Sequence, residues 1–311
     1  MERSEDGRMR SEPPRWLAVR APNVELEALT WGPDRGPVAL CLHGFPDTAY
    51  GWREFAPRLA AAGWRVVAPF MRGYAPSSIP SDGSYHIGAL MDDALRTRSA
   101  AGGTAHDVVI GHDWGALAAT GLAAMPGSPF AKAVIMSVPP AATFTSPANV
   151  AERAWLLGRL PRQLLRSWYI IYFQLPWLPE RSAPWVVPLL WRRWSPGYNA
   201  ARDLGHVEAA IGTPERWRAA LGPYRATIRA GRPPAQYADL HRYWTSAPVL
   251  PSLYLHGRDD GCMTPAFVRW TTNVLPAGSD VAVIEHAGHF LQLERPERVA
   301  ELVLRFIGPA D

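Results

Sequence analysis

The stretch "VVIGHDWGALAA" at residues 108–119 decides the fold of this chain. It begins as an apolar strand, turns sharply between Gly111 and Gly115, and continues as a helix of small residues. Small residues are needed there because the turn is strained and the helix must approach the strand closely. The pattern predicts a nucleophile elbow, a turn that exposes the side chain at its tip. That residue is usually serine, but here it is Asp113, which could also be the N-cap of an ordinary strand-to-helix loop.

The rest of the chain alternates apolar runs with helical patterns, which is typical of a parallel sheet with helical crossovers. Buried strands are expected at residues 38–44, 65–70, 107–113, 131–138, 251–257 and 281–288. Helices are expected near residues 51–62, 86–100, 115–124, 265–275 and 296–307. The expected fold class is therefore α/β, with a mostly parallel sheet flanked by helices.

The alternation stops in the middle of the chain, where a segment rich in tryptophan, arginine and proline carries no strand pattern. Eight of the fourteen tryptophans lie between residues 140 and 246. Ligands of open α/β sheets bind at the carboxyl ends of the strands, so an insertion after the fourth parallel strand predicts a helical cap over that edge. We expect a disordered tail at 1–14, a first core part at 15–139, a helical cap at 140–243 and a second core part at 244–311.

Composition limits the classes of function. The 311 residues carry a formal net charge of +4, and Lys132 is the only lysine among mostly arginine cations. No basic run with interleaved aromatics indicates a nucleic-acid groove, the polar N-terminus does not resemble a secretory signal, and no apolar run of ~18 residues predicts a membrane span. Cys41 and Cys262 do not imply a disulfide framework. We expect a cytoplasmic, bacterial-type protein with reduced thiols, a monomer or homodimer, without nucleic-acid or membrane partners.

Two segments near the C-terminus supply the partners that an elbow nucleophile needs. In "YLHGRDDGCM", Asp259 and Asp260 follow a strand, and in "HAGHFLQLERPE", His289 follows the next strand. An isolated loop histidine is more often a surface or capping residue, but nucleophile, acid and histidine occur here in the chain order of a hydrolase triad. We therefore predict a triad of Asp113, His289 and Asp260, with Asp259 as the alternative acid.

An aspartate nucleophile suits displacement at saturated carbon. A serine attacking such a carbon would form an ether, a dead end, whereas a carboxylate forms an ester that water can later cleave. His289, oriented by the acid, would activate that water. The oxyanion of this second step would form on Asp113 itself. Its expected donors are the backbone N–H groups of Trp114 and of Phe45 in the "HGFPD" loop.

The other residues of that loop are expected to support it. His43, Gly44 and Pro46 would position the Phe45 N–H without taking part in the chemistry. The chain has neither the ligand spacing of a metal site nor a phosphate-binding loop. We therefore expect no cofactor and no metal ion.

Together these motifs resemble the epoxide hydrolases of the α/β-hydrolase superfamily, in its Asp-nucleophile branch. The matching segments are "HGFPD" (43–47), "APFMRGYAPSS" (68–78), "GHDWGA" (111–116), "GRDD" (257–260) and "HAGH" (286–289). The resemblance covers nearly all of the chain after the tail and implies the α/β-hydrolase fold. It also implies that a small hydrophobic epoxide and water become a vicinal diol through an alkyl ester on Asp113. The family's GxxD pattern favours Asp260 over Asp259 as the acid.

The resemblance extends to two tyrosines of the cap that assist ring opening in this family. "YIIYFQLPWLPE" resembles the first tyrosine segment and maps onto Tyr169, and "LGPYRA" resembles the second and maps onto Tyr224. The epoxide oxygen leaves as an alkoxide, and a phenol supplies a hydrogen bond or a proton without adding charge to an apolar pocket. Tyr172, on the same helix as Tyr169, is expected to serve packing.

One departure from the family is Phe70, which stands where an acidic residue is common and is expected to reshape one wall of the site. The nearest alternative function is a dehalogenase, which uses the same Asp and His but releases a halide. Haloalkane dehalogenases commonly place Asn where this chain has Phe45, and fluoroacetate dehalogenases tend to place Arg where it has Trp114. Haloalkane dehalogenases do, however, use a tryptophan there to hold halide. A second alternative is a catalytically silent binding protein on the same fold.

Overall fold

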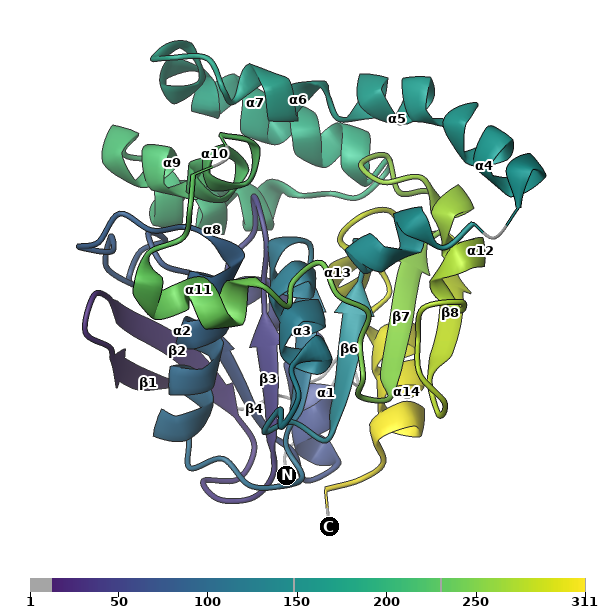
Figure 1. Cartoon of the computed structure of the whole chain (residues 1–311). Coiled ribbons are helices and arrows are strands. Elements are labelled where there is room, and N and C mark those ends of the chain that lie inside the picture. Colours follow the sequence, from purple (N-terminus) through teal and green to yellow (C-terminus); the bar gives the residue numbers. More distant parts are fainter. Residues whose placement is uncertain (1–12, 148, 230, 311) are drawn as a thin grey trace.

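The computed structural model describes residues 13–147, 149–229 and 231–310 and contains an eight-stranded sheet (Figure 1). Its strands are β1 (Arg15–Arg20), β2 (Glu25–Trp31), β3 (Val38–Leu42), β4 (Arg65–Pro69), β5 (Val108–His112), β6 (Lys132–Met136), β7 (Ser252–Gly257) and β8 (Asp280–Ile284). Their order is β1-β2-β4-β3-β5-β6-β7-β8, in which β2 is antiparallel to both neighbours and β3 to β8 run parallel. The mostly parallel sheet predicted from the alternating pattern is confirmed.

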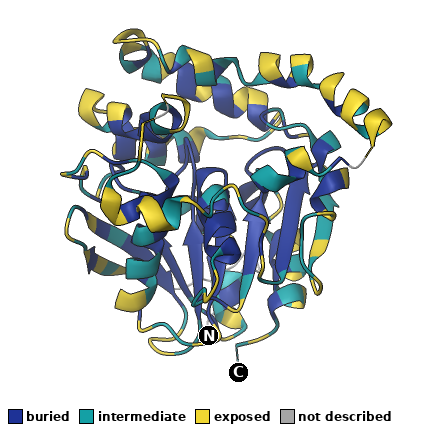
Figure 2. Ribbon diagram, viewed as in Figure 1, coloured by how far each residue is buried: buried dark blue, intermediate teal, exposed yellow. Residues whose placement is uncertain are grey.

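The central strands are continuous apolar runs because helices cover both faces of the sheet. Every residue of β3, β5 and β7 is buried, as expected for parallel strands that are shielded on both sides. On one face, α2 (Ile87–Ala100) and α3 (Trp114–Ala124) pack on each other and on the strands. On the other face, α1 (Ala56–Ala61) packs against α14 (Pro296–Ile307) (Figure 1). Figure 2 shows the buried strands beneath helices whose outer turns are exposed.

Helices replace strands between β6 and β7 and form the cap. They are η2 (Ala141–Thr145), α4 (Val150–Leu157), α5 (Leu160–Arg166), α6 (Trp168–Tyr172), α7 (Leu178–Trp194), α8 (Ala201–Ile211), α9 (Pro214–Ala220), α10 (Gly222–Ile228) and α11 (Ala235–His241). Figure 1 shows α4 to α10 above the sheet, and β6 is the fourth parallel strand along the chain, so the predicted position of the cap is confirmed. Helix α11 falls in the predicted cap range yet packs on α2 and α3, and the exact domain bounds stay a prediction. Within the described ranges, no helix has the length and apolar character needed to cross a bilayer.

The structure departs from the sequence-based prediction at one edge of the sheet and in two helices. The antiparallel pair of β1 and β2 was not predicted, because β1 is an edge strand with mostly exposed side chains and lacks a continuous apolar run. The remaining short helices are η1 (Ala49–Trp52), η3 (Pro265–Phe267), α12 (Val268–Thr271) and α13 (Leu291–Glu294). The helix expected near 51–62 is therefore divided into η1 and α1, and the helix near 265–275 into η3 and α12. Residues 1–12 of the expected tail lie outside the described residues.

Candidate active site

Asp113 occupies the tip of a sharp turn between β5 and α3. Its φ of +53° and ψ of −116° lie outside the regions that L-residues ordinarily adopt, and such a conformation persists only where the surrounding packing imposes it. A Cβ on Gly111 would lie 2.1 Å from the Gly115 oxygen, and a Cβ on Gly115 would lie 2.1 Å from the Leu42 oxygen. The two glycines therefore let the strand and the helix approach closely enough to hold this turn.

The loop after β3 brings backbone N–H groups to the elbow. The Phe45 N–H donates to Asp113 Oδ1 over 2.8 Å. A Cβ on Gly44 would lie 2.4 Å from the same oxygen and 2.7 Å from the Trp114 nitrogen, so only glycine fits there. Trp114 is the first residue of α3, where the helix dipole and free N–H groups favour a negative charge. Both predicted oxyanion donors therefore lie where this loop meets the elbow.

His43 and Pro46 hold the same loop in place. His43 Nε2 accepts the N–H of Met71 over 3.0 Å, which leaves Nδ1 to donate to the Gly44 oxygen over 2.9 Å. Burial lowers the pKa of His43 to about 4, so its ring is neutral. The Pro46 oxygen accepts a hydrogen bond from Trp191 Nε1 of the cap over 2.9 Å. These contacts tie the loop to the core on one side and to the cap on the other.

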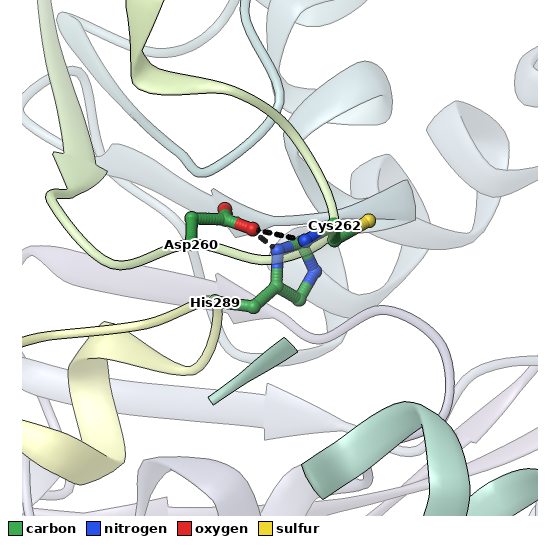
Figure 3. Close-up of side chains that lie close together, drawn as sticks. All are labelled: Asp260, Cys262 and His289. Carbon is green, nitrogen blue, oxygen red and sulfur yellow. Dashed lines mark hydrogen bonds and ion pairs between the residues drawn. The ribbon is translucent and has the colours of Figure 1, made fainter. Parts of the chain in front are cut away.

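The structure brings Asp113, His289 and Asp260 together from three separate segments. His289 Nδ1 lies 3.0 Å from Asp260 Oδ2, and His289 Nε2 lies 3.6 Å from Asp113 Oδ2. Asp260 Oδ1 accepts the backbone N–H groups of Cys262 and Met263, which directs the carboxylate at the imidazole (Figure 3). All three side chains of this group are buried. A histidine thus stands between two carboxylates.

The two carboxylates stabilise the positive charge of His289. Burial alone would lower the pKa of His289, but the carboxylates of Asp260 and Asp113 raise it to about 10. Burial would raise the pKa of Asp260, yet the charge of His289 holds it below its ordinary value. The resting state is therefore an imidazolium between two carboxylates. Asp259 has an exposed side chain, so the geometry selects Asp260 as the partner of His289.

Four residues that the sequence analysis missed hold the backbone at His289. His112 Nε2 and Ser137 Oγ both donate to the His289 oxygen, over 2.9 and 2.7 Å. Glu294 accepts the N–H of the residue before His289, and Ser195 Oγ accepts the N–H of the residue after it. Ser195 also donates to Glu294, which joins the end of a cap helix to the histidine loop. The motifs that contain His112 and Glu294 do not indicate these supporting roles, because three of the contacts join positions 95 to 177 residues apart.

Tyr169 in α6 and Tyr224 in α10 reach the site from the cap. Their ring centroids are 5.7 Å apart with perpendicular planes, and the Tyr224 ring lies 4.8 Å from that of Trp114. The Tyr169 hydroxyl lies 3.4 Å from Cys262 Sγ, and the buried Tyr224 hydroxyl has no hydrogen-bond partner among the described residues. Burial raises the pKa of both phenols well above its ordinary value. Both side chains therefore remain neutral hydrogen-bond donors.

Aromatic side chains surround the two phenols. Ring contacts link Tyr169 or Tyr224 to Phe45, Phe173 and Trp194 at centroid distances of 5.0–5.7 Å. Trp194 also contacts the His289 ring at 5.0 Å. Sites for small molecules commonly combine such an apolar lining with a few polar groups. These surroundings suit an apolar ligand.

Tyr172 and Phe70 make other contacts. The Tyr172 hydroxyl donates to Ser182 Oγ of α7 over 2.8 Å, which agrees with a packing role in the cap. Phe70 is buried and stacks on Trp16 of β1, with ring centroids 5.9 Å apart, and it meets Tyr50 edge-on at 5.6 Å. The ring therefore packs toward the edge of the sheet, and its effect on the wall of the site stays a prediction.

The best candidate for a metal site in the described part of the chain is formed by Asp260, Cys262 and His289, whose ligand atoms lie within 4.8 Å of one another (Figure 3). Both Asp260 oxygens already accept hydrogen bonds, one from the backbone and one from His289. Burial raises the pKa of the Cys262 thiol well above its ordinary value, which disfavours the thiolate that a metal would bind. This arrangement fits a hydrogen-bonded pair with a neutral thiol beside it.

Known proteins share both the sequence pattern and the fold. The family model of the alpha/beta hydrolase fold matches residues 37–296. The chain belongs to the α/β-hydrolase superfamily. An epoxide hydrolase of Caballeronia sordidicola is 31% identical, over 89% of this chain and 89% of its own length. The resemblance drawn from the motifs is thus confirmed, and the chain is a hydrolase of the epoxide hydrolase family.

Solved structures of this superfamily include both reaction types considered from the sequence. Epoxide hydrolase A of Mycobacterium thermoresistibile has a TM-score of 0.66 and 25% identity, covering 96% of this chain and 99% of its own. A loop variant of the haloalkane dehalogenase DbeA from Bradyrhizobium elkanii has a TM-score of 0.70 and 21% identity, covering 95% and 97%. The second likeness concerns the fold alone. The fold therefore does not separate the two reactions, and the residues of the site must do so.

Proposed function

We propose that this protein hydrolyses an epoxide to a vicinal diol through a covalent ester on Asp113. The observation that carries the proposal is a carboxylate at the elbow with His289 on one side and two buried phenols from the cap beside it. In this proposal the Asp113 carboxylate is the nucleophile, the two phenols donate a proton to the leaving oxygen, and His289 activates the water. These steps require no cofactor.

Ring opening begins with attack of Asp113 on an epoxide carbon. Oδ1 accepts the Phe45 N–H, so Oδ2 is the oxygen available for attack. As the bond from Oδ2 to carbon forms, the carbon–oxygen bond of the ring breaks and the oxygen takes a proton from Tyr169 or Tyr224. Burial keeps both phenols protonated, so both donors are in place before charge develops on that oxygen.

Formation of the ester changes the protonation of His289. The esterified Asp113 is neutral, so one of the two carboxylates that raise the pKa of His289 is lost. The imidazolium can then give its proton to the phenolate, and the neutral imidazole that results accepts one from water. That water adds to the ester carbonyl carbon, and the N–H groups of Phe45 and Trp114 stabilise the oxyanion. The bond between this carbon and the diol oxygen then breaks, the proton of the added hydroxyl passes to that oxygen, and the diol leaves with the carboxylate restored.

A dehalogenase is the alternative that one observation favours. Trp114 Nε1 is buried and has no hydrogen-bond partner among the described residues, so it is free to hold a halide. A halide, however, leaves as a stable anion and needs no proton from Tyr169 or Tyr224. An oxygen leaving group gives the two phenols a chemical role, and this supports epoxide opening over halide release.

The experiment follows diol formation from a styrene-oxide-type epoxide, with a haloalkane as counter-substrate. The wild type is compared with Asp113→Asn and with the double variant Tyr169→Phe/Tyr224→Phe. A hydrogen bond to a charged oxygen contributes about 1.5–3 kcal/mol, so loss of both phenols should lower kcat/KM by roughly 10²- to 10⁴-fold. Tyr172→Phe is the matched control, because its hydroxyl is bound to Ser182 within the cap.

The outcomes separate the candidates. Diol release that is abolished in Asp113→Asn, strongly reduced in the double variant and retained in Tyr172→Phe supports the proposal. Halide release without diol assigns the chain to the dehalogenases and leaves the phenols as packing residues. If a panel of epoxides and haloalkanes binds without any product, the protein is a binding module on a hydrolase fold.

A further inference from the structure

The outermost helices of the cap, α4 to α7, carry an unusual number of exposed apolar side chains. We call the surface formed by residues 150–194 the outer cap surface. Nine of the thirteen large hydrophobic side chains exposed in the described part of the chain lie here: Val150, Leu157, Leu164, Leu165, Ile171, Leu175, Trp177, Leu178 and Trp185. Figure 2 shows the exposed turns of these helices on the side away from the sheet. A concentration of this kind indicates an interaction surface rather than ordinary scatter.

The segment that forms this surface also carries a net positive charge. Residues 150–194 contain seven arginines and two glutamates, a formal charge of +5, whereas the whole chain has +4. One of the two acids, Glu180, is already paired with Arg225 from outside the segment, at 2.7 Å. Arg153 and Arg181 are among the exposed arginines of this segment, and the Arg181 guanidinium lies 5.7 Å from the ring of the exposed Trp177. The surface is therefore both apolar and strongly basic.

We propose that the outer cap surface docks on an anionic lipid bilayer. Helices with apolar side chains on an exposed face and arginines around them bind in the plane of the membrane interface. The apolar side chains insert into the bilayer, and the guanidinium groups contact acidic headgroups. Trp177 and Trp185 are exposed by 64% and 73%, and tryptophan favours this interface. A second copy of the chain fits less well, because a two-fold contact would place arginines against arginines.

Docking here would connect the membrane directly with the candidate active site. Helix α6 exposes Ile171 by 67% on the outside and buries Tyr169 beside the triad on the inside. An apolar epoxide dissolves in lipid, so a cap that rests on the bilayer would receive its substrate from there. The attachment itself does not depend on the proposed reaction. It departs from the expectation that no membrane is a partner, because exposure of these residues cannot be recognised in the sequence.

The test is flotation of the full chain with vesicles of phosphatidylcholine, with and without about 30% phosphatidylglycerol, an amount that gives a strongly anionic surface. The wild type should bind the anionic vesicles, and Leu165→Glu should lower the partition coefficient at least about tenfold, since a charge resists insertion. Val249→Glu is the matched control, an exposed apolar residue in the loop before β7. Arg153→Gln/Arg181→Gln should weaken binding and reduce its dependence on salt, whereas Arg20→Gln on β1 should not.

Other outcomes overturn the proposal. Absence of wild-type binding to anionic vesicles would refute it, as would equal binding by Leu165→Glu. If sedimentation instead shows a dimer that Leu165→Glu dissociates, and vesicles are not bound, the occupant is a second copy of the chain. Turnover of a water-soluble epoxide by Leu165→Glu, measured in parallel, shows whether the site is intact, so a failure of attachment is distinguishable from a failure of the proposed function.

Discussion

Replacement of Asp260 by Asn isolates the role of the carboxylate behind His289. In the proposed mechanism this carboxylate stabilises the imidazolium that forms when water is activated, and it takes no part in attack on the epoxide. Asn also offers an N–H₂ group to His289 Nδ1, which favours the tautomer with its proton on the wrong nitrogen. Asp260→Asn should therefore slow ester hydrolysis much more than ester formation.

The size of the effect follows from the geometry of the pair. Asp260 Oδ2 and His289 Nδ1 are 3.0 Å apart, and both side chains are buried. Unit charges about 4 Å apart at an effective dielectric constant near 20 attract by roughly 4 kcal/mol. Loss of that attraction corresponds to about a thousandfold slower hydrolysis, since each 1.36 kcal/mol is a factor of about ten in rate. The ester on Asp113 should accumulate as a result.

The assay is rapid mixing with epoxide, followed by mass measurement of the intact protein and by diol quantification. Asp260→Asn should gain the mass of one epoxide molecule, because ring opening adds the whole substrate, and should then release diol slowly. Asp259→Asn is the matched control, since the adjacent side chain is exposed, and it should turn over like the wild type. If ester hydrolysis slows by less than tenfold, or if turnover is slow without an adduct, the assignment of Asp260 to the hydrolysis step is refuted.

Two further predictions concern stability. Two carboxylates outweigh the effect of burial and raise the pKa of His289 to about 10. The stabilisation of the folded state by protonated His289 is therefore complete below the unfolded pKa of about 6.5, and it is lost as the pH rises toward 10. In urea titrations at about pH 6 and about pH 9.5, the stability gap between wild type and His289→Gln should narrow with rising pH; a widening gap contradicts this account. Gly115→Ala should destabilise by roughly 1–3 kcal/mol, because its Cβ would lie 2.1 Å from the Leu42 oxygen. Gly205→Ala, at an exposed position of α8 where the added Cβ has no atom within 4 Å outside the backbone of its own helix, should stabilise by up to about 1 kcal/mol. Thermal unfolding measures both substitutions, and a change of stability in the same direction for both would count against the packing argument.

The elbow could be predicted from a short stretch because its causes are local. Gly111 and Gly115 flank the strained residue, and the backbone atoms that they must admit belong to the same turn or to the neighbouring strand. The meeting of Asp113 with His289 was also within reach of the sequence. Both follow strands of a parallel sheet, and the carboxyl ends of such strands lie along one edge.

The supports of the site could not be predicted, because they join segments that are far apart. Tyr169 meets Cys262 across 93 residues, and Ser137 holds the His289 oxygen across 152. Such contacts depend on how segments far apart in the chain pack together, and no local periodicity carries that information. The pair of β1 and β2 was missed for a related reason. Edge strands have one solvated side, so their pattern is weaker than that of buried strands.

By itself the sequence determined the mostly parallel sheet, the elbow with Asp113 and the candidate partners, since apolar periodicity and glycine spacing act over a few residues. The sequence favoured Asp260 but left Asp259, a neighbour of identical chemistry, as an alternative; the tertiary structure places Asp260 against His289 and leaves Asp259 in solvent. It alone also showed that apolar residues of the cap, such as Leu165, remain exposed. Whether a helical residue is buried depends on what packs against the helix, and the residues of the helix alone do not show this.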